Sequence, residues 1–103
     1  IKAVALDYVR RYEAANGPGS VATFGAHAYD ASIMLNAAVT TALKSAKPGT
    51  QAFRSAVRDA LESTSGLVLT HGIMTTTATD HNGFDDRARV MVTIQDGAWK
   101  LLP

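Results

Sequence analysis

The stretch HAYDASIMLNAAVTTALKSA, residues 27–46, decides the fold because it predicts one long helix of unusual composition. Six alanines share it with large apolar residues, and Asp30 and Lys44 are its only Asp, Glu, Lys or Arg. The large apolar residues are Tyr29, Ile33, Met34, Leu35, Val39 and Leu43. A helix with so small a charged face needs burial on several sides. The rest of the chain is too short to supply that cover, so we expect neighbouring structure that this sequence does not contain.

A helix is predicted on each side of this stretch. Apolar residues recur at spacings of three and four from Ile1 to Tyr12, and this helix should end near Asn16-Gly17. Gly17 suits a left-handed position at a helix end, and Pro18 prevents continuation. Residues 20–24, SVATF, are predicted to be a short connecting stretch.

The third helix is predicted over residues 51–63, after a turn at 47–49. Thr50 is a suitable N-cap for it. Arg58 and Glu62 stand four residues apart and are expected to pair. Its predicted buried stripe consists of Phe53, Val57, Ala60 and Leu61.

Beyond Gly66 the pattern changes to that of extended chain. Residues 67–79 are rich in Thr and aliphatic residues, which favours strands. Residues 90–95 alternate between apolar and mixed positions, and Asp96-Gly97 separates them from the run AWKLL at 98–102. An Asp-Gly pair between two such runs is a strong signal of a hairpin. The predicted order is therefore three helices followed by strands.

The overall composition excludes several classes of protein. The chain has 103 residues, 47% hydrophobic and 18% charged, with a net charge of +1, which is typical of a soluble globular unit. Lys and Arg are scattered among Asp and Glu, so no footprint for nucleic acid is present. The absence of cysteine excludes disulfides, thiolate metal sites and Cys nucleophiles. Because Ile1 already lies inside a helical pattern without an N-cap, we expect the chain to be a piece of a longer protein.

The polar stretch TATDHNGFDD, residues 77–86, raises the question of a metal site. His71, Asp80 and His81 are its candidate ligands, but neighbouring residues on a strand point to opposite faces and could hardly reach one ion. The alternative is a polar turn at Asn82-Gly83, with Asp80 accepting backbone N–H groups. We predict that turn, with no metal and no cofactor.

A catalytic Ser-His-Asp set and a phosphate-binding loop are two further candidate sites in the sequence. His27 and Asp30 would share a helix face, but Ser32 would lie about 140° from His27. No Gly-x-Ser-x-Gly elbow is present to expose a nucleophile. Gly17, Gly19 and Ser20 follow a helix rather than a strand, which favours a helix-ending loop over a phosphate cradle. These patterns argue against an enzyme.

Several segments resemble a known family. The runs FGAHAYDA (24–31) and FRSAVRDALE (53–62) resemble the C-terminal part of type I periplasmic binding proteins, the branched-chain amino acid (Leu/Ile/Val) receptors of ABC importers. Gly72-Ile73, TDHNG (79–83) and QDGAWK (95–100) are similar to that family's closing segment. The resemblance covers essentially the whole chain.

The resemblance implies an α/β fold, as the C-terminal fragment of a two-lobe protein: three helices, then a hinge strand and a β-hairpin. Residues 1–71 would be the helical part of the N-terminal lobe, and residues 72–103 the hinge crossing and hairpin of the C-terminal lobe. It implies a periplasmic or lipid-anchored extracellular receptor that is not an enzyme. Its partners would be a small-molecule ligand, an ABC permease, and the missing N-terminal portion of the same protein or a second copy.

The resemblance also implies a ligand site between the lobes. The family's aromatic contact falls on Phe24, and Gly25, Ala26 and His27 flank it and are predicted to face the cleft. No polar clamp of the family is matched, so the ligand stays open among a branched-chain amino acid, an amide and an aromatic acid. Two alternatives stay open as well: a sensory or regulatory ligand-binding module of the same fold, and a small independent α+β enzyme.

Overall fold

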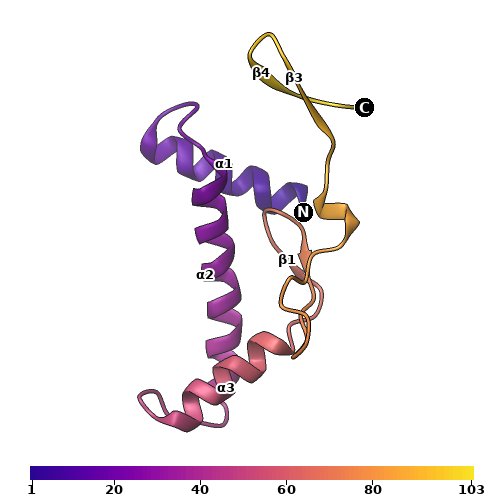
Figure 1. Ribbon diagram of the computed structural model, residues 1–103. Helices are drawn as coiled ribbons and strands as arrows, with labels where there is room; N and C mark the ends of the chain where they lie inside the picture. The colour runs from indigo at the N-terminus through magenta and orange to yellow at the C-terminus, as the bar shows by residue number, and fades with distance from the viewer.

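The computed structural model describes all residues, 1–103, as three helices followed by two small antiparallel sheets (Figure 1). The predicted order of helices and then strands is confirmed. The helices are α1 (Lys2–Asn16), α2 (Thr23–Ala42) and α3 (Gln51–Glu62). The strands are β1 (Leu67–Val68), β2 (Ile73–Met74), β3 (Val92–Gln95) and β4 (Ala98–Leu101), with the 3-10 turn η1 (Asp86–Ala88) before β3.

Helix α2 begins and ends earlier than predicted. It starts at Thr23, so the prediction that residues 20–24 form a connection was wrong at its last two positions. Ala22 takes an extended conformation before the helix and offers no side-chain cap, so no capping residue marks the start of α2 in the sequence. At the other end, the N–H groups of Lys44 and Ser45 bond three residues back, and this tighter turn replaces the predicted last helical turn.

The signals at the ends of α1 and α3 are confirmed. Gly17 follows α1 with φ +98°, and the Thr50 hydroxyl accepts a hydrogen bond from the Phe53 N–H at 3.1 Å. The predicted pairing of Arg58 with Glu62 is wrong. Arg58 instead binds the neighbouring Asp59 at 2.6 Å, while Glu62 lies 3.2 Å from the His81 ring. Glu62 therefore pairs with His81, which is distant in the sequence, and not with the nearby Arg58.

The central helix is poorly covered, as the sequence predicts. α1 crosses the start of α2 and α3 packs beside its end, so α2 stands as a rod between them (Figure 1). Its buried residues are Ala26, Asp30, Ala38 and Ala42, whereas Leu35 and Leu43 are exposed. The radius of gyration is 16.7 Å, whereas a compact domain of this length would have about 13 Å. The chain alone therefore does not close around its own apolar helix.

The β3–β4 hairpin is confirmed and stands away from the helices (Figure 1). Asp96 and Gly97 have φ +53° and +73°, the two positive values that a type I′ turn requires. The cross-strand pairs Val92–Leu101 and Ile94–Trp99 share one face of the hairpin, so that face is apolar. Every residue from Arg89 onward is exposed. A two-stranded hairpin with a bare apolar face needs a covering partner.

Within the stretch predicted as extended chain, residues 67–74 form a second, smaller hairpin, and residues 75–79 belong to no strand. β1 pairs with β2 in the register Leu67–Met74 and Val68–Ile73. The predicted boundary between residues 71 and 72 falls inside the turn between these two strands, and the assignment to two lobes stays a prediction. None of the helices is long and apolar enough to cross a membrane.

We predict that the chain self-associates through the apolar face of the β3–β4 hairpin. Replacing Ile94 with lysine should reduce association, because it places a charge on the exposed apolar face. Thr93→Lys, on the opposite face of the same strand, is the matched control and should associate like the wild type. Light scattering over a concentration series measures this. A wild-type chain that stays monomeric at high concentration would contradict the prediction.

Candidate functional site

Four side chains from two distant segments meet at the start of α2. Thr23, His27 and Asp30 lie four and three residues apart and so form one stripe on the helix. His71, in the turn between β1 and β2, lies along this stripe. Its Nδ1 is 2.8 Å from Asp30 Oδ2, its Nε2 is 3.2 Å from Thr23 Oγ1, and its ring stacks on His27 at 3.8 Å between centroids. We call this set of four residues the His71 clamp.

The carboxylate of Asp30 is the buried centre of the clamp. Its residue is only 4% exposed, yet four donors reach it. Besides His71 Nδ1, they are the Thr70 N–H at 2.8 Å, the Thr70 hydroxyl at 2.8 Å and the His71 N–H at 3.2 Å. Burial by itself raises the pKa of Asp30, but the hydrogen bonds from Thr70 and His71 together lower it below its usual value. Asp30 is therefore ionised, and His71 Nδ1 carries a proton to donate to it.

The clamp combines residues that sequence analysis had placed in separate groups. Ser32 does not join His27 and Asp30, because its hydroxyl donates to the Tyr29 carbonyl at 2.6 Å. His71 does not join Asp80 and His81. The sequence signal that could have revealed the clamp is Asp30 itself, because a lone carboxylate on an alanine-rich helix needs a partner once it is buried.

The polar turn at residues 80–83 is confirmed. Asp80 Oδ1 accepts hydrogen bonds from the N–H groups of Asn82 at 2.9 Å and Gly83 at 3.4 Å. His81 turns toward Glu62 on α3. The stretch that suggested a metal site therefore shapes the chain and ties it to the end of α3.

The order Asp30–His71–Thr23 is also that of a catalytic relay, in which a carboxylate orients an imidazole against a hydroxyl. The surroundings favour a structural use. One face of the His71 ring is covered by His27, with the two rings parallel to within 2°. The two main cavities of the structure are lined by other residues. The relay lies outside these two cavities, and its hydrogen bonds hold the turn against α2.

The four predicted ligand residues divide into two pairs. Phe24 is 83% exposed, and His27 is exposed above the His71 ring. Gly25 and Ala26 instead face inward: Ala26 is buried, and a Cβ on Gly25 would come within 2.6 Å of the Tyr8 hydroxyl. The absence of a side chain on Gly25 leaves room for Tyr8 of α1. The contact of any of these residues with a ligand stays a prediction.

Three tyrosines fix α1 across the start of α2. Tyr8 lies 5.6 Å from Tyr12 and 5.0 Å from Tyr29 between ring centroids, and Arg11 donates to the Tyr29 hydroxyl at 2.7 Å. Burial raises the pKa of Tyr8, so its hydroxyl stays protonated. That hydroxyl is buried without a hydrogen-bond partner. A shallow cavity of about 370 Å³ lies beside this cluster.

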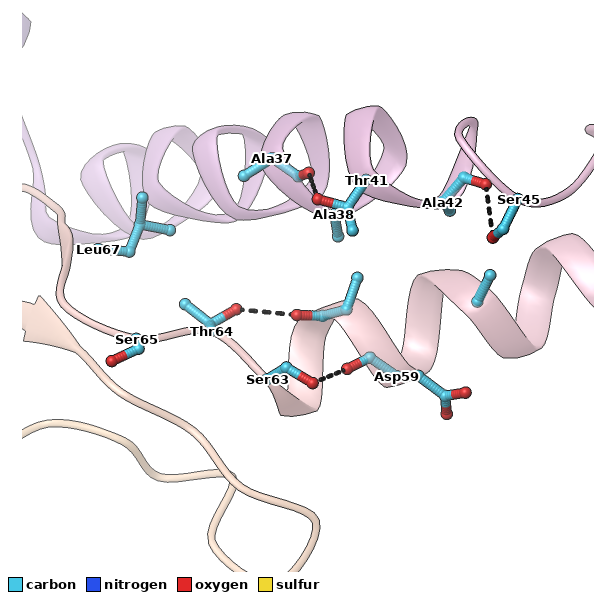
Figure 2. A pocket seen from close by; sticks show the side chains of 12 residues that line it. Ala37, Ala38, Thr41, Ala42, Ser45, Asp59, Ser63, Thr64, Ser65 and Leu67 are labelled. Atoms are coloured by element: carbon cyan, nitrogen blue, oxygen red, sulfur yellow. Dashed lines mark hydrogen bonds between the residues drawn. The ribbon is translucent and has the colours of Figure 1, made fainter.

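A groove of about 500 Å³ lies between α2 and α3 (Figure 2). It is lined mainly by small residues, and several of its hydroxyls bond to nearby backbone carbonyls. Thr41 donates to the Ala37 carbonyl, Ser63 to the Asp59 carbonyl and Thr64 to the Ala60 carbonyl (Figure 2). The groove is therefore of mixed character, with alanines beside hydroxyls and the Asp59 side chain.

Solved structures provide the comparison with known proteins. No family model and no curated protein matches the chain. An extracellular ligand-binding receptor from Rhodopseudomonas palustris HaA2 matches 99% of the chain with a TM-score of 0.89 and 37% identity. The protein Rp1789 of Rhodopseudomonas palustris strain CGA009 matches 99% with a TM-score of 0.89 and 42% identity. A further extracellular ligand-binding receptor from Rhodopseudomonas palustris matches 92% with a TM-score of 0.82 and 40% identity.

These likenesses define the class: the chain has the fold of a segment of an extracellular ligand-binding receptor. It spans between 26% and 29% of the length of the receptors it matches. The resemblance seen in the sequence is confirmed, and the chain is a fragment of the type I periplasmic-binding-protein fold. Two of these solved structures are described as extracellular ligand-binding receptors.

Replacing Asp30 with asparagine tests the centre of the clamp. The amide keeps the shape but turns an NH2 group toward the donors of Thr70 or His71, so we expect a loss of about 3 kcal/mol of stability at neutral pH. Urea unfolding followed by circular dichroism measures this. Asp96→Asn, at the exposed hairpin turn, is the matched control and should cost little.

The pH dependence of stability provides a second test of the Asp30→Asn variant. Because the folded pKa of Asp30 lies below the ordinary 3.8, its stabilisation is complete above that pH and is lost as the pH falls through the lowered value. Asp30→Asn should lack this part of the acid dependence. Identical stability profiles of wild type and variant between pH 7 and pH 2 would refute the role given to the carboxylate.

Replacing Gly25 with alanine should destabilise the contact between α1 and α2. Within a helix this change normally stabilises by about 1 kcal/mol, but here the new Cβ would meet the Tyr8 hydroxyl at 2.6 Å. In a Tyr8→Phe background the nearest atoms would be 3.8 and 3.9 Å away, so the usual gain should return. The melting temperatures of the two single variants and of the double variant test this prediction. A melting temperature of Gly25→Ala above that of the wild type would contradict it.

Proposed function

We propose that the chain is part of the solute-binding receptor of an ABC importer, which binds an amino acid or related small molecule between two lobes. The observation that carries this proposal is the match of 99% of the chain to an extracellular ligand-binding receptor. Phe24 and His27, exposed together at the start of α2, support a ligand wall at that point.

The start of α2 has the chemistry of such a wall. Ala22 supplies no side-chain cap, so the first N–H groups of the helix lack a side-chain acceptor. The N-terminus of a helix favours anionic groups, such as the carboxylate of an amino acid or aromatic acid. The exposed ring of Phe24 beside it would supply the apolar floor that small-molecule sites favour.

In this proposal residues 1–71 belong to the N-terminal lobe, and residues 72–103 to the hinge crossing and the C-terminal lobe. Ligand bound at the start of α2 would favour the closed arrangement of the lobes through contacts that the open arrangement lacks. The closed receptor would then present its docking surface to the ABC permease in the periplasm. No bond is made or broken, and neither a metal nor a cofactor takes part.

Phe24→Ala in the full-length gene product tests the ligand wall. We first screen that product by thermal shift against L-leucine, L-isoleucine, L-valine and benzoate, and then measure the best ligand by calorimetry. Loss of the aromatic floor should weaken binding at least about tenfold, equal to about 1.4 kcal/mol. Asn36→Ala, which changes an exposed polar residue farther along the same helix, is the matched control and should bind normally.

Two results would count against this function. One is a full-length product that binds none of the four compounds. The other is tight L-leucine binding by the 103-residue chain alone, because a segment of this size holds only part of a two-lobe cleft. Equal weakening of binding by Asn36→Ala and Phe24→Ala would also count against the ligand wall, because it would indicate an effect on the whole helix.

A further inference from the structure

The His71 ring is held more completely than a tie between a turn and a helix requires. Both of its nitrogens have partners on α2, with Nδ1 at Asp30 and Nε2 at Thr23. Its backbone N–H also reaches Asp30 Oδ2 at 3.2 Å. The ring therefore has a fixed position and a fixed plane, set by residues on either side of it along the helix.

The fixed plane of the His71 ring determines the orientation of the His27 ring. An exposed histidine on a helix has several side-chain rotamers open to it. Here the His27 ring lies parallel to His71 within 2° and 3.8 Å away, while the residue stays exposed. His27 itself has no hydrogen bond in the structure that would otherwise orient its ring. The stack on His71 is thus the contact that selects its orientation, three residues from Phe24.

The hydrogen bonds of His71 do not depend on the charge of its ring. Because Asp30 is ionised, Nδ1 must carry a proton, so neutral His71 is the Nδ1–H tautomer. Nε2 then accepts a hydrogen bond from the Thr23 hydroxyl, and in the charged ring it donates to the same oxygen. A hydroxyl can play both parts without moving, whereas an ionised carboxylate only accepts. The plane offered to His27 therefore stays the same in both states.

We infer that His71 is a positioning residue of the proposed ligand site: Asp30 and Thr23 orient its ring, and its ring orients His27. The inference rests on the proposed role of Phe24 and His27 as a ligand wall. It assigns a function to a side chain in the β1–β2 turn, some 40 residues from the wall that it supports.

Nuclear magnetic resonance of the histidine rings tests the inference on the full-length gene product without any ligand. In the wild type, long-range proton–nitrogen correlations should show neutral His71 as the Nδ1–H tautomer. The ring protons of His27 should lie upfield, because they sit over the His71 ring. Thr23→Val keeps the shape but removes the hydroxyl, so the His27 signals should move toward those of a free histidine, and Thr23→Ser should restore them.

His81, which contacts Glu62 on α3, is the internal control and should not move in either variant. Asp30→Asn provides a stronger perturbation where it folds, and should displace the signals of both His71 and His27. An Nε2–H tautomer for His71 in the wild type would overturn the inference. So would His27 signals that stay unchanged in Thr23→Val.

A second measurement separates this inference from the proposed function. In the full-length product, Thr23→Val should lower the affinity for L-leucine severalfold in the wild type and have no further effect in a His27→Ala background, because it acts through His27. Equal effects in both backgrounds would overturn the positioning role. If L-leucine does not bind the wild type, the proposed ligand fails, and the ring measurements still decide the inference.

Discussion

The arrangement of helices and strands depends on the buried carboxylate of Asp30. A buried charge is costly unless hydrogen bonds replace the water it has lost. Thr70 and His71, which supply them, stand 40 and 41 residues further along the chain. The cost of leaving the carboxylate unpaired therefore holds the β1–β2 turn against α2. Leu69, fully buried beside these residues, adds the apolar part of the same contact.

Small residues determine how the helices meet. Ala38 and Ala42 lie one turn apart on α2 and are almost completely buried where α3 approaches. Gly25 does the same for α1, where the Tyr8 ring needs the space of the missing Cβ. Close approach by small residues buries little apolar area per residue, so these contacts orient the helices but contribute modestly to stability. The apolar side chains that would contribute more, such as Leu35 and Leu43, stay exposed and await cover from the rest of a receptor.

Helix ends and turns that are set by residues close together in the sequence are predicted correctly. Gly17, Thr50 and the pair Asp96-Gly97 act within a few residues, and each marked its helix end or turn correctly. The start of α2 was misplaced because Ala22 carries no capping side chain to mark it. The clamp was missed because its parts lie far apart in the sequence, and nothing in the neighbourhood of His71 shows that Asp30 is its partner. The pairing of Arg58 with Glu62 was wrongly predicted for the same reason, since the actual partner of Glu62 is His81, which is 19 residues away in the sequence.

The contacts of the second half of the chain limit where a hinge between the two predicted lobes could lie. Thr76 bonds the Thr64 carbonyl, and His81 reaches Glu62, so the chain beyond β2 remains attached to α3. Gly72 is buried under Phe84 and Ala88, so η1 is attached to the β1–β2 turn. Arg89 contacts Asp86 of η1, and the residues beyond Arg89 are exposed and pair only within the hairpin. A pivot at residue 72 would have to break the clamp and these contacts, whereas a pivot in residues 90–91 would break none of them.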